Sequence, residues 1–252
     1  MLQVFSHPDE VVEIRLDRPP VNALNPALVR ELRDTIRRQT AEGARALVLS
    51  GRPGLFSAGL DVPELLQLDE DGMRAFWRDF FGLLQQVAAS PVPIATALTG
   101  HSPAGGTVIA LYADYRIQAE GEFRMGLNEV QVGLVIPPVI HQALVRLIGP
   151  YAAERHLVAG EMIPTARALE LGLIDEIVPA DAVIESAVAW CRRHLALPPQ
   201  AMQATRALCR ADLVDSFQAA HALDVDGFVR GWFSDETQAT MRGLVERLKK
   251  AG

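Results

Sequence analysis

The chain has 252 residues, 49% of them hydrophobic, which is enough apolar material for one large domain or for one domain with an appendage. Lysine and arginine total 24 against 31 acidic residues, so the formal net charge is −7. This acidic balance argues against a nucleic-acid partner, because such proteins present a basic face. No apolar run approaches the roughly 18 residues that would predict a membrane-spanning helix, so we expect no membrane contact.

The N-terminus and the cysteines indicate the compartment. The first residues show neither the basic and apolar regions of a secretory signal nor an Arg- and Ser-rich transit segment, so we expect a cytoplasmic protein. Cys191 and Cys209 lie in helix-like segments without metal-ligand spacing. We therefore expect two buried thiols in a reduced compartment.

Strand and helix patterns alternate in the first fifty residues. Residues 11–16 alternate like a strand, and the prolines that follow end it. A helix is predicted from Pro26, with Asn25 as its N-cap and Gly43 beyond its end. Residues 46–49 form an apolar run typical of a buried parallel strand. One face of the helix carries Leu28, Leu32 and Ile36. This β-α-β order favours an α/β fold.

A loop and two helices are predicted next. Residues 51–59 are typical of a loop, residues 62–68 predict a short helix, and residues 69–89 predict a long one. The apolar face of the long helix carries Met73, Phe76, Trp77, Phe80, Leu84 and Val87. We interpret these residues as core packing. The alternative is that some of them line an apolar channel.

The central stretch, residues 97–106, consists mostly of small residues. A strand at 93–98 is expected to run into a loop, and a helix is predicted at 107–113. A strand, a small-residue loop and a helix start together aim free backbone N–H groups at an oxygen atom. Glycine in such a loop lets the backbone approach a ligand closely. Two other stretches accompany it, residues 56–61 upstream and 126–129 downstream.

The second half of the chain becomes progressively helical. Strands are expected at 115–119, 122–126 and 173–178, and helices at 139–148, 152–159, 165–171 and from 181 onward. Residues 133–138 are irregular, and residues 200–250 contain no strand pattern. We divide the chain into an α/β core, residues 1–195, and a helical region, residues 196–252.

The helical region is expected to cover apolar surface. It carries the large apolar residues Phe217, Phe228, Trp232 and Phe233. Such a region folds over its own core or packs on a neighbouring subunit. The second arrangement is partly favoured, so we expect an oligomer.

Three residues suggest a chemistry. Leu60 and Gly105 both lie in small-residue loops, and their backbone N–H groups would form an oxyanion hole if they converged. Glu129 is the candidate base, because an apolar stretch raises the pKa of a carboxyl group. The non-catalytic alternative is that Glu129 is a solvated loop residue. His101 is a second candidate base, although a lone histidine is more often structural. We find no Ser-His-Asp pattern, phosphate-binding loop or metal-ligand cluster in the sequence.

Over nearly its whole length the chain resembles the crotonase (enoyl-CoA hydratase/isomerase) superfamily. The matching pieces are Leu16-Asp17-Arg18-Pro19 with Val21-Asn22-Ala23-Leu24-Asn25, Phe56-Ser57-Ala58-Gly59-Leu60-Asp61, Pro103-Ala104-Gly105-Gly106, Ala113-Asp114-Tyr115-Arg116 and Leu171-Gly172-Leu173-Ile174-Asp175. Within that superfamily, the stretches 57–61, 98–100, 103–106 and 126–129 resemble Δ3,Δ2-enoyl-CoA isomerases of the mitochondrial type.

The resemblance implies a fold and an assembly. The fold would be a spiral of repeated ββα turns, closed by a C-terminal helical region that builds homotrimers, often stacked as hexamers. The substrate would be an acyl-CoA thioester, and no separate cofactor or metal is expected.

The resemblance also implies site residues. Motif alignment places the two oxyanion donors on Leu60 and Gly105 and the base on Glu129. The substrate-binding residues would be Ala58, Gly59, Leu60, Asp61, Val62, Gly105 and Asn128. Hydratases of the superfamily carry a second glutamate three residues after the oxyanion glycine, where this chain has Val108. One acid suits an isomerase of fatty acid β-oxidation.

The chain departs from the superfamily pattern in one respect. Many members have a lysine after the Ala-Gly-X-Asp motif, near the nucleotide of coenzyme A, where this chain has Val62 and Pro63. Phosphate contacts would then come from Arg18, or from the basic residues Arg247, Lys249 and Lys250 of a neighbour. The alternative is that these last three residues form a solvated helix end and bind no phosphate.

Two other functions remain open from the sequence. One is hydration or another crotonase-type reaction, such as dehalogenation, hydrolysis or decarboxylation. The other is acyl-CoA binding without turnover, against which the retained Glu129 counts. An ultraviolet assay with 3-enoyl-CoA distinguishes the three.

Overall fold

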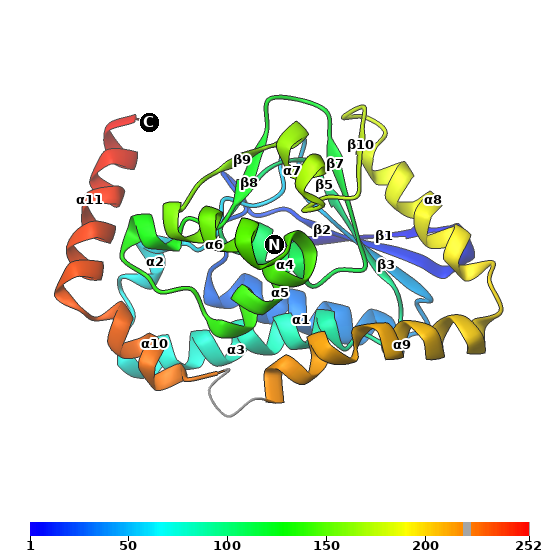
Figure 1. The fold of residues 1–252 in the computed structure, drawn as a ribbon, viewed down its shortest axis with the longest axis horizontal. Coiled ribbons are helices and arrows are strands. Elements are labelled where there is room, and N and C mark those ends of the chain that lie inside the picture. The colour runs from blue at the N-terminus through cyan, green and yellow to red at the C-terminus, as the bar shows by residue number, and fades with distance from the viewer. Residues whose placement is uncertain (219–222, 252) are drawn as a thin grey trace.

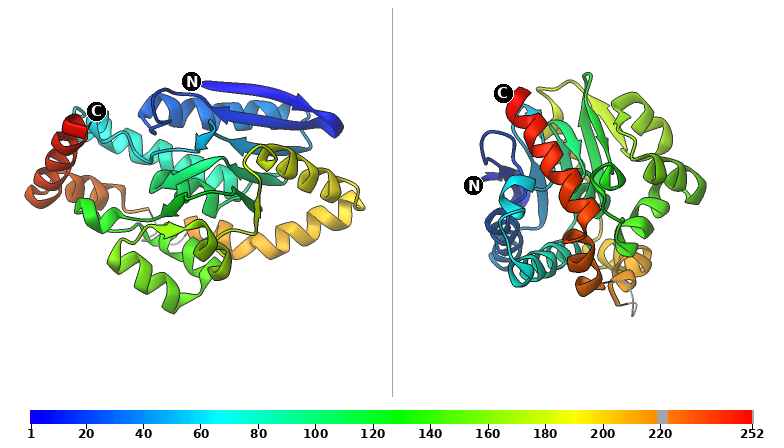
Figure 2. Two further views of the ribbon diagram at one scale, coloured as in Figure 1. Left: turned by 90° about the horizontal axis from the view of Figure 1, so that it is seen from above. Right: turned by 90° about the vertical axis from the view of Figure 1, so that its left-hand side faces the viewer.

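A computed structural model describes residues 1–218 and 223–251, with side chains up to residue 247. Its main sheet has six strands in the order β1-β2-β3-β5-β7-β10. The hairpin of β1 and β2 is antiparallel and forms one edge, and all other neighbours are parallel (Figure 2). The strands are β1 (Leu2–His7), β2 (Val11–Leu16), β3 (Ala46–Ser50), β5 (Ile94–Leu98), β7 (Tyr115–Ala119) and β10 (Glu176–Val178). Sequence patterns missed β1, whose side chains are mostly exposed.

A second sheet of short strands extends the first. Its order is β4-β6-β8-β9, and the chain passes from β3 into β4, from β5 into β6 and from β7 into β8. These strands are β4 (Gly54–Leu55), β6 (Gly100–Pro103), β8 (Arg124–Gly126) and β9 (Ile163–Pro164). The repeated passage from one sheet to the other, followed by helices, is the expected spiral of ββα turns.

Strand β6 corrects the prediction of a loop at this position. Its sequence, Gly-His-Ser-Pro, lacks strand-forming residues. Gly100 is nevertheless needed, because a Cβ atom there would lie 1.9 Å from the backbone carbon of Gly54 on the paired strand β4. Close backbone contact therefore forms this strand, and intrinsic propensity does not.

Helices cover both faces of the main sheet. Asn25 accepts a hydrogen bond from the Leu28 amide and caps α1 (Pro26–Ala41), and Asp69 caps α3 (Glu70–Ala88) in the same way. These two helices pack together on one face (Figure 1). Helix α8 (Val183–Leu195) packs on the other face, against β3, β5 and β7. Alternate residues of β3 accordingly enter two different apolar clusters.

The remaining helices of the core follow the predicted order. Helix α2 ends three residues earlier than expected. These helices are α2 (Val62–Leu65), α4 (Gly105–Leu111), α5 (Pro138–Ile148), α6 (Pro150–Ala159) and α7 (Thr165–Leu171). Short 3-10 helices span Pro8–Glu10, Glu129–Val132 (η2) and Ser216–Gln218.

The C-terminal helices fold against their own chain. They are α9 (Pro199–Asp215), α10 (Val225–Trp232) and α11 (Asp235–Ala251). Phe217 and Trp232 are buried, and the ring of Phe228 lies 5.8 Å from that of Trp77 in α3. The large apolar side chains therefore do not by themselves require a neighbouring subunit. The division at residue 195 and the oligomeric state stay predictions.

Two further observations concern the cysteines and the membrane. Cys191 is buried in α8 as expected, but Cys209 in α9 is exposed, which corrects the expectation of two buried thiols. Among the described residues, no helix combines the length and the apolar character needed to cross a membrane.

Candidate active site

Two loops that are more than forty residues apart in the sequence meet at the ends of the strands. One is the loop before α2, with Gly59 and Leu60, and the other is the turn before α4, with Ala104 and Gly105. A Cβ atom on Gly59 would lie 3.3 Å from the amide nitrogen of Gly105 and 3.0 Å from the Cβ atom of Ala104. Gly59 also has φ +85°, a conformation that favours glycine. Glycine at this position therefore allows the two loops to touch.

The Leu60 amide is left free by the hydrogen bonds around it. The Leu24 amide donates to the Gly59 oxygen (2.7 Å), and the Asp61 amide donates to the Leu24 oxygen (3.1 Å). These two hydrogen bonds form a short parallel β-bridge, in which the carbonyl group before Leu60 and the amide group after it both bond to Leu24. Because neighbouring amides of an extended chain point in opposite directions, the Leu60 N–H points away from Leu24. It donates none of the hydrogen bonds found in the described part of the chain.

The Gly105 amide is free for a different reason. Gly105 is the first residue of α4, and the first amides of a helix have no partner within the helix. Ala104 before it adopts φ +45° and ψ −117°, a strained conformation for a residue with a side chain. The Ala104 amide donates to the Gly126 oxygen (2.8 Å), which holds the turn in place. Such strain is typical of functional sites, and here it sets the direction of the next amide.

Glu129 lies on the opposite side of the same space. It begins η2, and its Oε2 atom is fully buried without a hydrogen-bond partner among the described residues. Desolvation by burial raises the pKa of Glu129 from 4.5 to about 7, while its own backbone amide acts in the opposite direction. The segment is anchored from α11, where the Thr237 hydroxyl donates to the Gly133 oxygen (2.6 Å). Glu129 is therefore poised to take and release a proton near neutral pH.

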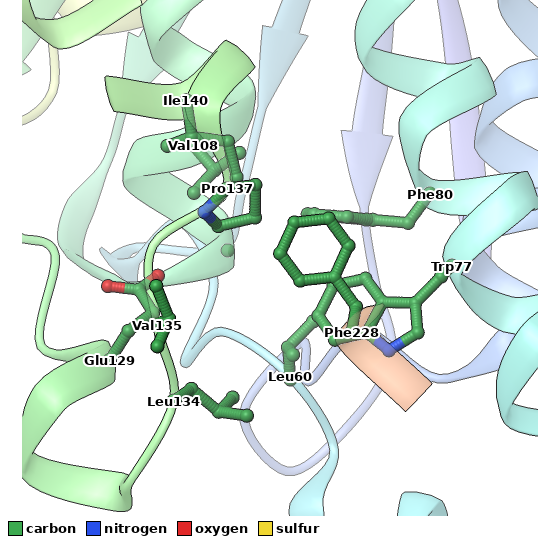
Figure 3. Close-up of a pocket in the computed structure, with 11 residues that line it drawn as sticks. Leu60, Trp77, Phe80, Val108, Glu129, Leu134, Val135, Pro137, Ile140 and Phe228 are labelled. Atoms are coloured by element: carbon green, nitrogen blue, oxygen red, sulfur yellow. The ribbon is translucent and has the colours of Figure 1, made fainter. Parts of the chain in front are cut away.

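Leu60, Gly105 and Glu129 line one small inner pocket. Its other walls are apolar, and Figure 3 shows the rings of Trp77, Phe80 and Phe228 across the pocket from Glu129. The remaining lining residues are Val108, Leu134, Val135, Pro137 and Ile140. The three residues that the sequence proposed for catalysis thus meet in one apolar cavity.

A larger outer cleft adjoins the inner pocket, and Leu60, Glu129 and Leu134 line both. The cleft has a volume of about 560 Å³, against about 30 Å³ for the inner pocket. Met241 and Leu244 of α11 contribute to its wall. Figure 1 shows α11 on the same side of the molecule as α2. The two cavities together offer a narrow apolar end and a wide, more polar end, with Glu129 and Leu60 between them.

Comparisons with known proteins identify the family of the chain. The sequence profile of the enoyl-CoA hydratase/isomerase family matches residues 6–251. The chain belongs to the enoyl-CoA hydratase/isomerase family. Mitochondrial enoyl-CoA delta isomerase 1 of Homo sapiens is 33% identical over 254 residues, covering 98% of this chain and 84% of that protein. The crystal structure of human mitochondrial Δ3-Δ2-enoyl-CoA isomerase matches with a TM-score of 0.92 and 32% identity, covering 98% of each chain. A probable enoyl-CoA hydratase of Mycobacterium tuberculosis is 35% identical over 196 residues, covering 76% of this chain and 74% of that protein.

The other residues predicted from the family resemblance lie around the same space. Ala58, Asp61, Val62 and Asn128 line the outer cleft. Asp61 also accepts a hydrogen bond from the Glu64 amide (3.1 Å) and so caps α2. Gly59 lies at the contact between the two loops and provides space there. Val108, at the position where the sequence resemblance implied a second glutamate for a hydratase, contributes an apolar side chain to the lining of the inner pocket.

His101 and Arg18 are engaged elsewhere. His101 is exposed on β6, where its Nδ1 accepts a hydrogen bond from the Arg124 amide (3.2 Å), and it lines neither cavity. Arg18 does line the outer cleft, but its guanidinium is paired with Asp61 and Glu64. It therefore does not offer the free positive charge expected of a phosphate contact. Arg247 is exposed, and the side chains of Lys249 and Lys250 lie outside the described residues.

Sequence patterns missed part of the inner pocket. Val135 and Pro137 belong to the irregular stretch after η2, and Phe228 comes from α10, far along the chain. Trp77 and Phe80 were assigned to the core, and both are buried there while they also line the pocket. These two residues therefore pack in the core and also line a small apolar pocket, whereas an apolar channel stays a prediction. No local signal marks Phe228, because its place depends on how α10 packs on α3.

Proposed function

We propose that this protein is a Δ3,Δ2-enoyl-CoA isomerase, which converts 3-enoyl-CoA into trans-2-enoyl-CoA. The observation that carries the proposal is a single buried carboxylate, Glu129, in the same apolar pocket as two unpaired amides. A 1,3-proton shift requires one base and a site that stabilises negative charge on an oxygen. The similarity to enoyl-CoA isomerases supports the same activity.

The reaction balances with the groups present. The thioester oxygen is placed between the Leu60 and Gly105 amides, the acyl chain in the inner pocket and the coenzyme A portion in the outer cleft. Glu129 removes a proton from C2, and the C–H electron pair moves into a dienolate whose negative charge lies on the thioester oxygen. The protonated carboxyl then returns the proton to C4, and the double bond forms between C2 and C3. No electrons are gained or lost, so the proposed reaction needs no redox cofactor.

One base suffices because C2 and C4 are close. They are about 2.5 Å apart in ordinary covalent geometry, so one carboxylate reaches both from the same face of the dienolate. Hydration requires a water molecule to be activated and a proton to be supplied, for which paired acids are suited. Val108 can do neither, so we expect poor hydration of 2-enoyl-CoA, and Val108→Glu is expected to add only trace hydratase activity.

The deciding experiment measures conjugation by ultraviolet absorbance with 3-enoyl-CoA as substrate. We expect wild-type protein to form the 2-enoyl product and Glu129→Gln to lose about 10²–10⁴-fold in kcat, because the amide keeps the shape but cannot act as a base. Acyl-CoA binding, measured by calorimetry, should persist in the variant. Glu122→Gln is the matched control, because Glu122 is exposed and lines neither cavity.

Two results would contradict the proposal. One is near wild-type turnover by Glu129→Gln, and the other is binding of 3-enoyl-CoA by wild-type protein without any conjugated product. The second result would favour an acyl-CoA-binding protein. In D₂O, some substrate proton should be retained at C4, since one shielded carboxyl group carries it across.

The assembly and the compartment are part of the proposal. We propose a homotrimer or a dimer of trimers that acts in the cytoplasm on intermediates of fatty acid β-oxidation. Light scattering at micromolar concentration should show a mass well above the 27.4 kDa of the single chain. A stable monomer would contradict the proposed assembly.

A further inference from the structure

Arg18 connects the two segments that surround Leu60. It follows β2, and its side chain is only 21% exposed. Its Nη1 donates to the Ala23 oxygen (3.0 Å) and lies 2.7 Å from Oδ2 of Asp61. Its Nη2 donates to Oε2 of Glu64 (3.0 Å). One guanidinium thus holds the residue before Leu24 and the residue after Leu60.

The partners of Arg18 are themselves structural. Asp61 caps α2 through the Glu64 amide, and Glu64 accepts hydrogen bonds from the side-chain amide of Asn25 (2.9 and 3.0 Å). Asn25 in turn caps α1. The ion pairs of Arg18 therefore link the starts of α1 and α2 to the segment after β2, at a partly buried position where charged hydrogen bonds are strong.

Leu60 lies between the segments that Arg18 connects. The bridge between Leu24 and Leu60 determines which way the Leu60 amide points, because its flanking groups bond to Leu24. Arg18 holds one strand of this bridge through Ala23 and the other through Asp61. A change in the distance between the strands would turn the Leu60 N–H away from the thioester oxygen.

We propose that Arg18 is a positioning residue for the Leu60 donor, which acts through Asp61 and not as a phosphate contact. This inference rests on the proposed function, because it assigns a role within the oxyanion hole. The positive charge of Arg18 faces two carboxylates, so the local charge does not attract a phosphate group. Loss of Arg18 should therefore weaken stabilisation of the dienolate more than it weakens binding of the substrate.

The test uses a chromophoric thioester, a cinnamoyl-CoA with an amino substituent on its ring. Hydrogen bonds to its carbonyl oxygen polarise the conjugated system and shift its absorption to longer wavelength. We expect a red shift on binding to wild-type protein and a smaller one on binding to Arg18→Gln, with nearly unchanged Kd. The kcat for 3-enoyl-CoA should fall about tenfold, less than the loss expected for deleting a donor outright. Arg18→Lys should recover part of the red shift, because a lysine can pair with Asp61.

A matched control and a second variant keep the test decisive. Arg33 and Asp79 form another partly buried ion pair (2.8 Å) between α1 and α3, so Asp79→Asn should leave the red shift unchanged. If Arg18→Gln does not fold, Asp61→Asn provides the same test and should also reduce the red shift. In the double variant the two losses should be less than additive, since both residues act through one contact.

The outcomes separate this proposal from the proposed function. A higher Kd for acyl-CoA with an unchanged red shift in Arg18→Gln would mean a phosphate contact and would overturn the proposal. An unchanged red shift together with an unchanged Kd would overturn it as well, and so would the absence of a red shift in wild-type protein. A wild-type red shift that depends on Arg18, without isomerase turnover, would overturn the proposed reaction and leave the role of Arg18 standing.

Discussion

The two walls of the candidate site are built from different parts of the chain. One wall, residues 58–61 and 103–105, presents backbone amides and consists of small residues around Leu60. The rest of the lining, the side-chain wall, presents side chains, with the carboxyl group of Glu129 across the pocket from the rings of Trp77, Phe80 and Phe228 (Figure 3). The first wall depends on the direction of its amides and on the absence of side chains. The second depends on the chemistry and volume of its side chains.

The difference predicts opposite responses to mutation. On the backbone wall, a substitution matters when it removes an N–H group or adds a Cβ atom at a contact. On the side-chain wall, a substitution matters when it changes charge or volume. The predictions below test this contrast, from the largest expected effect to the smallest.

The largest effect on the backbone wall is expected from removing a backbone donor. Leu60→Pro deletes the amide hydrogen, so kcat for isomerisation should fall about 10²–10³-fold. Leu60→Ala removes most of the side chain but keeps the amide, and should retain most of the activity. Circular dichroism must show that both variants fold. Equal, mild losses in the two folded variants would contradict the role of the Leu60 amide.

A second effect concerns stability on the side-chain wall. The pKa of Glu129 is raised to about 7 in the folded protein, so the folded state binds its proton more tightly than the unfolded state. This carboxyl group therefore destabilises the fold increasingly between about pH 4.5 and 7, and fully above pH 7. Glu129→Gln should raise the free energy of unfolding by about 3 kcal/mol at pH 8, and this gain should vanish near pH 4.

Urea denaturation at several pH values measures this gain directly. The same group predicts that kcat/KM of the wild-type protein rises with pH through about 7, because the base of the free protein must be ionised. A pH-independent difference in stability between the wild type and Glu129→Gln would show that the carboxyl group is not desolvated in the folded state.

A smaller effect is expected at the contact between the two loops. Gly59→Ala places a Cβ atom 3.0 Å from that of Ala104 and 3.3 Å from the Gly105 amide, which should push the loops apart and lower kcat by about tenfold. Gly54→Ala is the matched control, because Gly54 has nearly the same φ (+84°) but no atom within 4 Å of its Cβ position. Both variants should lose about 1–2 kcal/mol of stability from backbone strain. Similar kcat values in the two would argue against a tight contact.

The smallest effect concerns substrate length. Phe228→Leu shortens a side chain at the far wall of the inner pocket, so the ratio of kcat/KM for longer to shorter 3-enoyl chains should rise by less than about tenfold. Phe233→Leu is the control, because Phe233 lies at the end of α10 and does not line the pocket. An unchanged preference in Phe228→Leu would place the acyl chain elsewhere.

The backbone wall could be located from the sequence. Runs of small residues such as Ser57-Ala58-Gly59 and Pro103-Ala104-Gly105 are local signals, and the Asn25 cap and the apolar runs at β3 and β5 indicated the α/β order. β1 and β6 were missed, because their residues lack an apolar alternation and their pairing depends on neighbours. Cys209 was placed inside the protein although one face of α9 is exposed.

The sequence by itself determined the order of most elements, the small-residue runs around Leu60 and Gly105 and the presence of a carboxyl group at residue 129. These properties depend on a few neighbouring residues, as caps, turns and periodic apolar faces do. Only the tertiary structure decided that Phe228 would face Glu129, that Oε2 of Glu129 would be buried without a partner and that Arg18 would pair with Asp61 and Glu64. Burial and ion pairing join residues that are 43 to 99 positions apart, and no local pattern contains the packing that brings them together.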